Sequence, residues 1–139
     1  MKPPEPKPLT ARKAGPLRGR VRVPGDKSIS HRALMLGALS TGRTRIRGLL
    51  EAEDVVNTAK AVTALGAPAQ KTGDVWEVLG RGAGGLAQPS GAIDFGNSGT
   101  GARLMMGVIA GHDISVEMTG DASLQRRPMG RVLAPLREM

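Results

Sequence analysis

Four side chains that can bind or activate an acidic ligand lie close together near the start of the chain. Lys27, Ser28, His31 and Arg32 come directly after the turn-forming pair Gly25-Asp26 and directly before an apolar run typical of a helix. The first backbone N–H groups of a helix have no partner within the helix, and its dipole places partial positive charge there. A hydroxyl, a lysine and an arginine at such a helix start therefore predict a site for a phosphate or a carboxylate.

A second stretch repeats this arrangement. The loop 96–101 (GNSGTG) combines three glycines with an amide and two hydroxyls, and an apolar run follows it. Glycines let backbone N–H groups approach an anion closely, but the loop is neither a P-loop nor GxGxxG, so an ordinary strand-to-helix turn explains it equally well. The pair Arg126-Arg127 is a third candidate, because a guanidinium binds carboxylate or phosphate through two parallel hydrogen bonds. Only one of the two arginines need point into a site.

These features also have ordinary structural interpretations. The charges around Lys27 can form a solvated helix face, and Ser28 or Ser30 can be an N-cap. Lys27 is the one candidate here that could also transfer a proton, provided that neighbouring cations favour its neutral form. We expect no paired carboxylates in catalytic positions, and the single residues Asp26 and Asp121 suit turns as well as a site.

The composition limits the class of partner. The 139-residue chain carries a net charge of +8, which indicates either nucleic acid or small phosphorylated or carboxylated metabolites. Aromatic residues make up only 1% of the chain, so little can stack on bases, and the arginines form no run; both observations disfavour nucleic acid. Cysteine is absent and the two histidines stand alone, which excludes disulfides and a thiol nucleophile and gives no metal-ligand spacing.

The N-terminus and the hydropathy pattern suggest a compartment. Residues 1–17 contain five prolines and four Lys/Arg without hydrophobic periodicity, so we expect a flexible leader there. No apolar run approaches membrane-spanning length, and the leader lacks the apolar core of a secretion signal. We therefore expect a cytoplasmic protein without membrane contact.

Periodicity and turn residues predict a mixed α/β fold. Gly66 is expected to end the second helix, and Trp76 is expected to pack in the face of a hairpin rather than bind a ligand. The expected elements are a strand at 21–23, an apolar helix through 33–39, a strand at 43–47, a helix at 55–65, a hairpin of 67–71 and 75–79, a strand at 92–95, a helix at 102–110, a strand at 114–118, a loop at 120–125 and a helical stretch at 126–139.

The two halves of the chain match in element order. Gly25 corresponds to Gly96 (96 − 25 = 71) and Arg32 to Arg103 at the same offset, so each half is expected to run strand, helix, strand, helix. The first unit closes with a hairpin, whereas the second stops before one, and missing strands leave a sheet edge uncovered. We therefore expect an N-terminal fragment of a longer protein.

Four segments, in order, closely resemble the N-terminal part of 5-enolpyruvylshikimate-3-phosphate (EPSP) synthases, in the bacterial class that includes glyphosate-tolerant enzymes. They are PGDKSISHRALMLGALSTG, LLEAEDVVNTAKAVTALGA, DFGNSGTGARLMMG and GDASLQRRPMGRVLAPLREM. The resemblance covers about residues 17–139 and implies a two-lobed α/β fold built from βαβαββ units. Residues 18–139 would then form part of the N-terminal lobe, with one unit at about 21–80 and an incomplete one at about 92–139.

This resemblance also implies a reaction. The enolpyruvyl group of phosphoenolpyruvate is transferred to the 5-hydroxyl of shikimate 3-phosphate with release of phosphate, a step of the shikimate pathway to aromatic amino acids. No metal or organic cofactor is implied. Lys27 would contact both substrates and act in proton transfer, whereas Ser28 and Arg32 would hold shikimate 3-phosphate.

The second loop would hold the other substrate. By resemblance, the backbone N–H of Gly99 and the guanidinium of Arg127 would bind phosphoenolpyruvate, at the position for which the inhibitor glyphosate competes. Asn97 would order the loop and Thr100 would add a substrate contact. Tolerant enzymes place alanine where this chain has Gly99, so we expect no such steric protection here.

Other interpretations stay open. The family's acidic catalytic residues lie downstream of these 139 residues, so the chain alone is expected to be inactive and to act by complementation with the missing C-terminal part of the enzyme. The related UDP-N-acetylglucosamine enolpyruvyl transferases use a Lys-Asn pair where this chain has Lys27-Ser28, and commonly a cysteine, which disfavours that family. A basic nucleic-acid-binding module is the alternative from another class.

Overall fold

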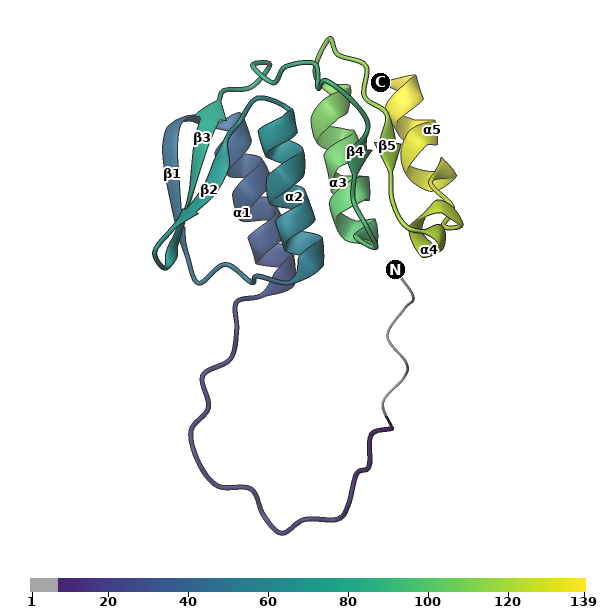
Figure 1. Ribbon diagram of the computed structural model, residues 1–139. Helices are drawn as coiled ribbons and strands as arrows, with labels where there is room; N and C mark the ends of the chain where they lie inside the picture. Colours follow the sequence, from purple (N-terminus) through teal and green to yellow (C-terminus); the bar gives the residue numbers. More distant parts are fainter. Residues whose placement is uncertain (1–7) are drawn as a thin grey trace.

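A three-stranded antiparallel sheet packs against two helices, and a third helix joins this layer to a smaller two-stranded sheet (Figure 1). The computed structural model describes residues 8–139. The elements, in order, are α1 (Lys27–Leu39), β1 (Thr41–Arg47), α2 (Glu53–Ala64), β2 (Ala69–Thr72), β3 (Val75–Arg81), β4 (Ile93–Asp94), α3 (Gly99–Ala110), β5 (Met118–Thr119), α4 (Ala122–Gln125) and α5 (Gly130–Glu138). The chain therefore has the mixed α/β composition that its sequence predicts.

The larger sheet has the strand order β1-β3-β2, with both pairs antiparallel. The predicted hairpin is confirmed as β2 and β3. Trp76 lies in its face opposite Ile46, packs against the core and donates from Nε1 to Glu51 Oε1 at 3.3 Å. Gly66, with φ +88°, follows α2 in the left-handed conformation that ends a helix, as predicted.

The core is aliphatic, as the shortage of aromatic residues requires. α2 lies between α1 and α3 and contacts both, so the three helices share one interior (Figure 1). The largest fully buried apolar side chains come from these helices, β3 and the end of β4, and they are Leu34, Val55, Val62, Leu65, Val78, Phe95 and Met105. Burial of such side chains fixes the helix starts relative to one another, which is what a site built at those starts needs.

The prediction of a strand at 21–23 is wrong. Val21 and Val23 are 89% and 76% exposed, and residues 8–26 form no helix or strand and extend away from the body (Figure 1). The reason is the lack of a neighbouring strand whose backbone groups could pair with them. Residues 1–7 of the predicted leader lie outside the described residues.

The second half also differs from expectation at three places. The strand predicted at 114–118 is reduced to β5, because Ser115 N donates to Gln88 Oε1 at 2.8 Å instead of joining a strand ladder. Residues 122–125, predicted as loop, form α4, because the Asp121 side chain caps them. The last helix begins at Gly130 rather than 126, since Pro128 disfavours helical backbone at the residue before it.

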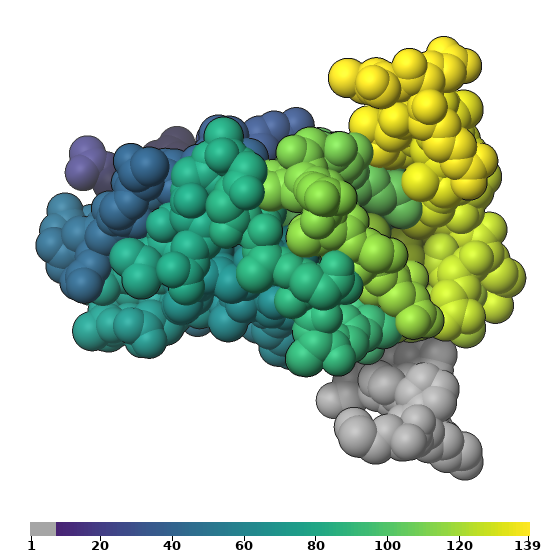
Figure 2. Space-filling view, turned by 90° about the horizontal axis from the view of Figure 1, so that it is seen from above, coloured from purple at the N-terminus to yellow at the C-terminus, as the bar shows by residue number. Residues whose placement is uncertain are grey.

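The element order of the repeat is retained in part. The second half runs β4, α3, β5 and then helix, as predicted, whereas the first half lacks the strand before α1. β4 and β5 are parallel, with Ile93 opposite Met118. α5 buries no side chain, and Figure 2 shows the C-terminal residues projecting beyond the rest of the molecule. Within residues 8–139, no helix has the length and apolar character needed to cross a membrane.

Candidate active site

The first residues of three helices meet at one cavity of about 350 Å³. The cavity is lined by Lys27, Glu53, Asp54, Asn97, Gly99, Thr100 and Arg127. Lys27 begins α1, Glu53 begins α2 and Gly99 begins α3, so three positive helix-dipole ends point toward the same space. Unpaired backbone N–H groups at such ends bind anions, and their convergence is the strongest indication of a site in the described chain.

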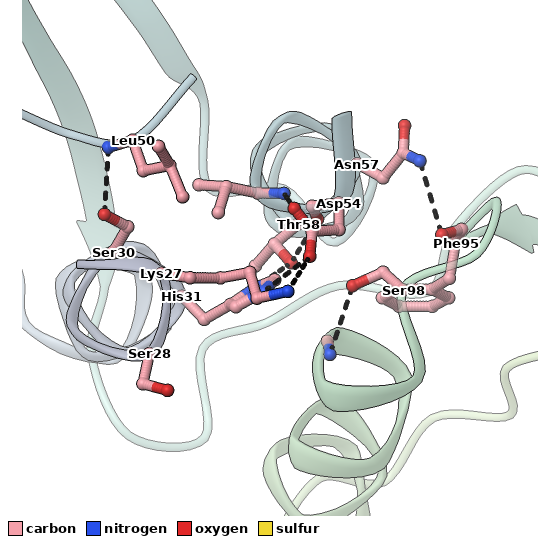
Figure 3. A network of polar contacts seen from close by, with 12 residues as sticks. Lys27, Ser28, Ser30, His31, Leu50, Asp54, Asn57, Thr58, Phe95 and Ser98 are labelled. Atoms are coloured by element: carbon pink, nitrogen blue, oxygen red, sulfur yellow. Dashed lines mark hydrogen bonds and ion pairs between the residues drawn. The ribbon is translucent and has the colours of Figure 1, made fainter. Parts of the chain in front are cut away.

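Five of the seven predicted site residues line this cavity, namely Lys27, Asn97, Gly99, Thr100 and Arg127. The other two, Ser28 and Arg32, do not. Both are exposed on α1, and Arg32 Nη1 donates to the backbone oxygen of Ser28 at 3.0 Å. The Ser28 side chain points away from Lys27 and its neighbours (Figure 3). Their assignment to shikimate 3-phosphate therefore stays a prediction.

α1 is capped differently from expectation. Its N-cap is Asp26, which accepts from Ile29 N at 2.8 Å, rather than Ser28 or Ser30. The Ser30 hydroxyl donates to the Asp26 backbone oxygen at 2.7 Å and accepts from Leu50 N at 3.0 Å (Figure 3). Ser30 thus ties the start of α1 to the segment that leads into α2.

A chain of side-chain hydrogen bonds holds Arg127. Its Nη2 donates to Asn97 Oδ1, and Asn97 Nδ2 donates to Asp121 Oδ2 at 2.8 Å. The backbone N–H of Leu124, with smaller contributions from Asn97 and Arg127, holds the pKa of Asp121 below its usual value. Of the arginine pair, Arg127 lines the cavity, whereas Arg126 is exposed and does not.

Gly99 lies where a side chain would not fit without movement. A Cβ atom at this position would lie 2.5 Å from Arg127 Nη1 and 3.1 Å from Arg103 Nη1. The helix that Gly99 begins is capped by Ser98, whose Oγ accepts from Gly101 N at 3.2 Å (Figure 3). The absence of a side chain at residue 99 therefore lets a guanidinium stand directly over the start of α3.

Carboxylates also line the cavity, and they come from a pair of residues that we did not expect at the site. Glu53 and Asp54 both line the cavity. Lys27 Nζ lies 3.1 Å from Asp54 Oδ2, so Lys27 forms an ion pair with a carboxylate of α2. The signal in the sequence is the acidic pair Glu53-Asp54 directly before the helix predicted at 55–65, where the helix dipole favours negative charge. The cavity is therefore lined by two positively charged side chains, Lys27 and Arg127, and by two negatively charged ones, Glu53 and Asp54.

His31 lies beneath this ion pair and is fully buried. Its Nδ1 lies 2.8 Å from Thr58 Oγ1, and its Nε2 lies 3.9 Å from Asp54 Oδ2 (Figure 3). Burial lowers the pKa of the imidazole below its usual value; the carboxylate of Asp54 opposes this, and the charges of Lys27 and Arg32 lower the pKa further. His31 is therefore neutral near pH 7. Within residues 8–139, no three His, Cys, Asp or Glu side chains are grouped to hold a metal ion.

Comparisons with known proteins agree on one family. The model of the family described as EPSP synthase (3-phosphoshikimate 1-carboxyvinyltransferase) matches residues 11–139. The chain is 63% identical over 136 residues to a 3-phosphoshikimate 1-carboxyvinyltransferase of Bradyrhizobium diazoefficiens, covering 97% of the chain and 29% of the relative. It is 60% identical over 134 residues to one from Pseudomonas sp. strain PG2982, covering 96% of the chain and 30% of the relative.

Solved structures give the same result. EPSP synthase from Acinetobacter baumannii superimposes with a TM-score of 0.81 and 43% identity, over 87% of this chain and 27% of that one. The chain thus spans about 30% of the length of the curated relatives that it matches.

Proposed function

Because this chain belongs to the EPSP synthase family, we propose that it supplies the N-terminal part of an enzyme that transfers the enolpyruvyl group of phosphoenolpyruvate to the 5-hydroxyl of shikimate 3-phosphate, with release of phosphate. The observation that carries this proposal is the meeting of three helix starts with Lys27 and Arg127 at one cavity. Both proposed substrates carry several negative charges, which such a cavity would bind.

The proposed role of each residue in substrate binding follows from the position of its side chain or backbone group. Arg127, held by Asn97, and the backbone N–H of Gly99 bind phosphoenolpyruvate, and Thr100 adds a hydroxyl beside them. The Gly99 N–H donates to the Asn97 backbone oxygen at 2.9 Å in this structure, and phosphoenolpyruvate would replace that acceptor. Lys27 lies on the opposite helix and contacts both substrates. In the addition step the 5-hydroxyl adds to C2 of phosphoenolpyruvate, and the tetrahedral intermediate then loses phosphate. The cavity's fixed cations stabilise the phosphate as it leaves.

Shikimate 3-phosphate would approach from the exposed side of α1. Ser28 and Arg32 are solvent-exposed there, one and five residues after Lys27 in α1, and their partners would come from the C-terminal part of the enzyme. On this proposal residues 18–139 are part of the N-terminal lobe. They contain about one and a half to two βαβαββ units, one at about 21–80 and an incomplete one at about 92–139. The orders α1–β3 and β4–α5 agree with such units, except that the first lacks its opening strand.

The test joins this chain to the C-terminal remainder of the Bradyrhizobium relative, in place of that relative's own first 29%. We call this chimera the joined enzyme. It is expected to release phosphate from the two substrates, and Lys27→Ala is expected to abolish the release. Absence of phosphate release by a folded joined enzyme, while the intact relative is active, would refute the proposal.

The arginine pair offers a matched control. Arg127→Ala removes a cation that lines the cavity, so KM for phosphoenolpyruvate is expected to rise by about 100-fold, as for loss of a strong charged hydrogen bond of about 3 kcal/mol. Arg126→Ala removes the same charge outside the cavity and is expected to change KM less than about twofold. Equal effects of the two variants would mean that only net charge matters.

A mixture of the two separate polypeptides tests the alternative of complementation. The 139-residue chain and the remainder of the relative are expected to be inactive alone and active together. Activity of the joined enzyme without activity of the mixture would mean that the chain does not assemble with a detached partner.

A further inference from the structure

The buried imidazole of His31 has one nitrogen without a partner. Among the described residues, His31 Nε2 and Arg103 Nε are the buried side-chain polar atoms that make no hydrogen bond. Asp54 Oδ2 lies 3.9 Å from His31 Nε2, beyond hydrogen-bond distance. A fully buried polar atom without a partner costs free energy, so its position beside the cavity calls for an explanation.

The hydrogen-bond partners of Thr58 decide which nitrogen carries the proton. The Thr58 hydroxyl donates its one hydrogen to the backbone oxygen of Asp54 at 3.3 Å. We infer that His31 Nδ1, at 2.8 Å from the same hydroxyl oxygen, is then the donor to it. In the neutral ring this tautomer leaves a lone pair on Nε2, which lies 3.9 Å from Asp54 Oδ2.

The ring is confined in this orientation. A Cβ atom at Gly101 would lie 2.8 Å from Thr58 Oγ1 and 3.4 Å from His31 Cε1, so α3 packs directly onto the pair. The charged groups that face the ring are Lys27 and Arg32 from α1 and Asp54 from α2. From α3 the neighbours are Gly101 and the hydroxyl of Ser98, which carry no charge.

One carboxylate oxygen therefore stands between two nitrogens. Asp54 Oδ2 is 3.1 Å from Lys27 Nζ on the solvent side and 3.9 Å from His31 Nε2 on the buried side (Figure 3). An anion in the cavity competes with Asp54 for the ammonium of Lys27. If the ammonium turns to the anion, Asp54 Oδ2 loses its partner while Oδ1 still accepts from Val55 N at 3.0 Å, and a partly buried carboxylate oxygen without a partner is costly.

We propose that His31 is a positioning residue for Lys27. When an anion draws the ammonium of Lys27 away, His31 takes up a proton from solvent on Nε2, and the resulting N–H donates a hydrogen bond to Asp54 Oδ2. A hydronium ion in solvent loses its proton and becomes water as the N–H bond forms on Nε2, so anion binding is accompanied by uptake of a proton. The exchange leaves Asp54 with a partner in both states and lowers the cost of releasing Lys27. The role of this exchange in substrate binding rests on the proposed function, whereas the contact itself can be tested without substrate.

The first experiment imitates the release of Lys27 in the 139-residue chain. The chain contains only two histidines, so ¹⁵N-histidine labelling gives one signal set for His31 and one for His112, which serves as the internal control. The variants are Lys27→Met, Asp54→Asn and the double variant. In Lys27→Met, Asp54 has lost its ammonium, so the pKa of His31 is expected to rise by at least about one pH unit and Nε2 to become protonated.

The double variant separates this exchange from simple loss of a positive charge. Removal of the Lys27 charge acts on His31 whether or not Asp54 is present, but the exchange requires the carboxylate. The rise caused by Lys27→Met is therefore expected to fall to less than half in the Asp54→Asn background. An equal rise in both backgrounds, or an Nε2 that never takes up a proton while the chain is folded, would overturn the proposal.

The second experiment tests the role in binding with the joined enzyme. His31→Gln can place an amide donor near Asp54, whereas the shorter His31→Asn can satisfy Thr58 only. His31→Asn is expected to raise KM for phosphoenolpyruvate about tenfold with kcat within about twofold, and His31→Gln to recover most of this loss. Equal loss in both variants would mean a packing role and would overturn the proposal. An inactive joined enzyme with His31 intact would instead refute the proposed function and leave the labelling experiment to judge His31.

Discussion

A methyl group at residue 99 should displace the guanidinium of Arg127. The alanine Cβ would lie 2.5 Å from Arg127 Nη1, whereas ordinary contact begins at 3.4 Å, so Nη1 must move by about 0.9 Å. Misplacement of a binding group by about 1 Å can cost up to about 100-fold. Arg127 is flexible and part of the loss is recovered by adjustment, so we expect a tenfold rise in KM for phosphoenolpyruvate, or about 1.4 kcal/mol.

The measurement is steady-state phosphate release by the joined enzyme and by its Gly99→Ala variant. KM for shikimate 3-phosphate should change little, because Gly99 lies on the Arg127 side of the cavity. The glyphosate inhibition constant should rise together with KM for phosphoenolpyruvate, since both ligands are expected to use the same guanidinium.

Gly107→Ala is the matched control. Gly107 lies in the same helix, α3, and a Cβ there would meet no atom within 4 Å. Both substitutions favour helix formation, so neither should lower the melting temperature. If Gly99→Ala, Gly107→Ala and the parent share one KM for phosphoenolpyruvate and one glyphosate inhibition constant, the close approach of Arg127 to Gly99 has no part in binding.

Three further predictions concern stability. Gly37→Ala would bring a Cβ to 3.3 Å from the side chains of Thr44 and Val78, which offsets the gain in helix propensity, so in thermal unfolding this variant should be about 1 kcal/mol, or about 4 °C in Tm, less stable than Gly107→Ala. Ser98→Ala removes the cap of α3 and should cost about 1 kcal/mol in a denaturant titration, whereas Ser98→Gly should cost only a few tenths. Because hydrogen bonds hold the pKa of Asp121 below its usual value, its charge stabilises the folded chain above the unfolded pKa of about 3.9, and this contribution disappears as the pH falls through the lowered value. Asp121→Asn keeps the capping oxygen, so its Tm should lie below that of the parent at pH 7 and converge with it near pH 2; a difference independent of pH would contradict the assignment.

Local sequence signals predicted the elements whose interactions are local. The α2 helix, the β2–β3 hairpin and the body of α3 depend on apolar periodicity and on turn residues such as Gly66, and the structure contains them, although α3 begins at Gly99 rather than at the predicted residue 102. The strand at 21–23 failed because strand formation needs a partner, which the alternation of Val21 and Arg22 cannot supply. In residues 120–139 two local signals override the apolar pattern: Asp121 caps the short helix α4, and Pro128 delays the start of α5 to Gly130.

The sequence predicted the anion-binding groups of the site but not the contacts that those groups make with other helices. Helix-start glycines and cations brought Lys27, Gly99 and Arg127 to attention, and the fold places them at one cavity. The contacts that tune them cross from one helix to another. Asp54 is 27 residues from Lys27 in the sequence, and the buried Thr58 hydroxyl meets His31 only when α1 and α2 pack. The hydrophobic periodicity of the sequence does not predict which side chains of two different helices will come into contact.

The origin of the cavity wall in three separate helices has a consequence for proteolysis. A cut in the connector between β3 and β4 would leave Lys27 and Asp54 on one piece and Gly99 and Arg127 on the other. A ligand that contacts both groups would hold the two pieces of a cut chain together without a covalent bond. The pieces would then separate more slowly as the ligand occupies a larger fraction of the sites. Retention of the two pieces on a sizing column would therefore report ligand occupancy without any turnover.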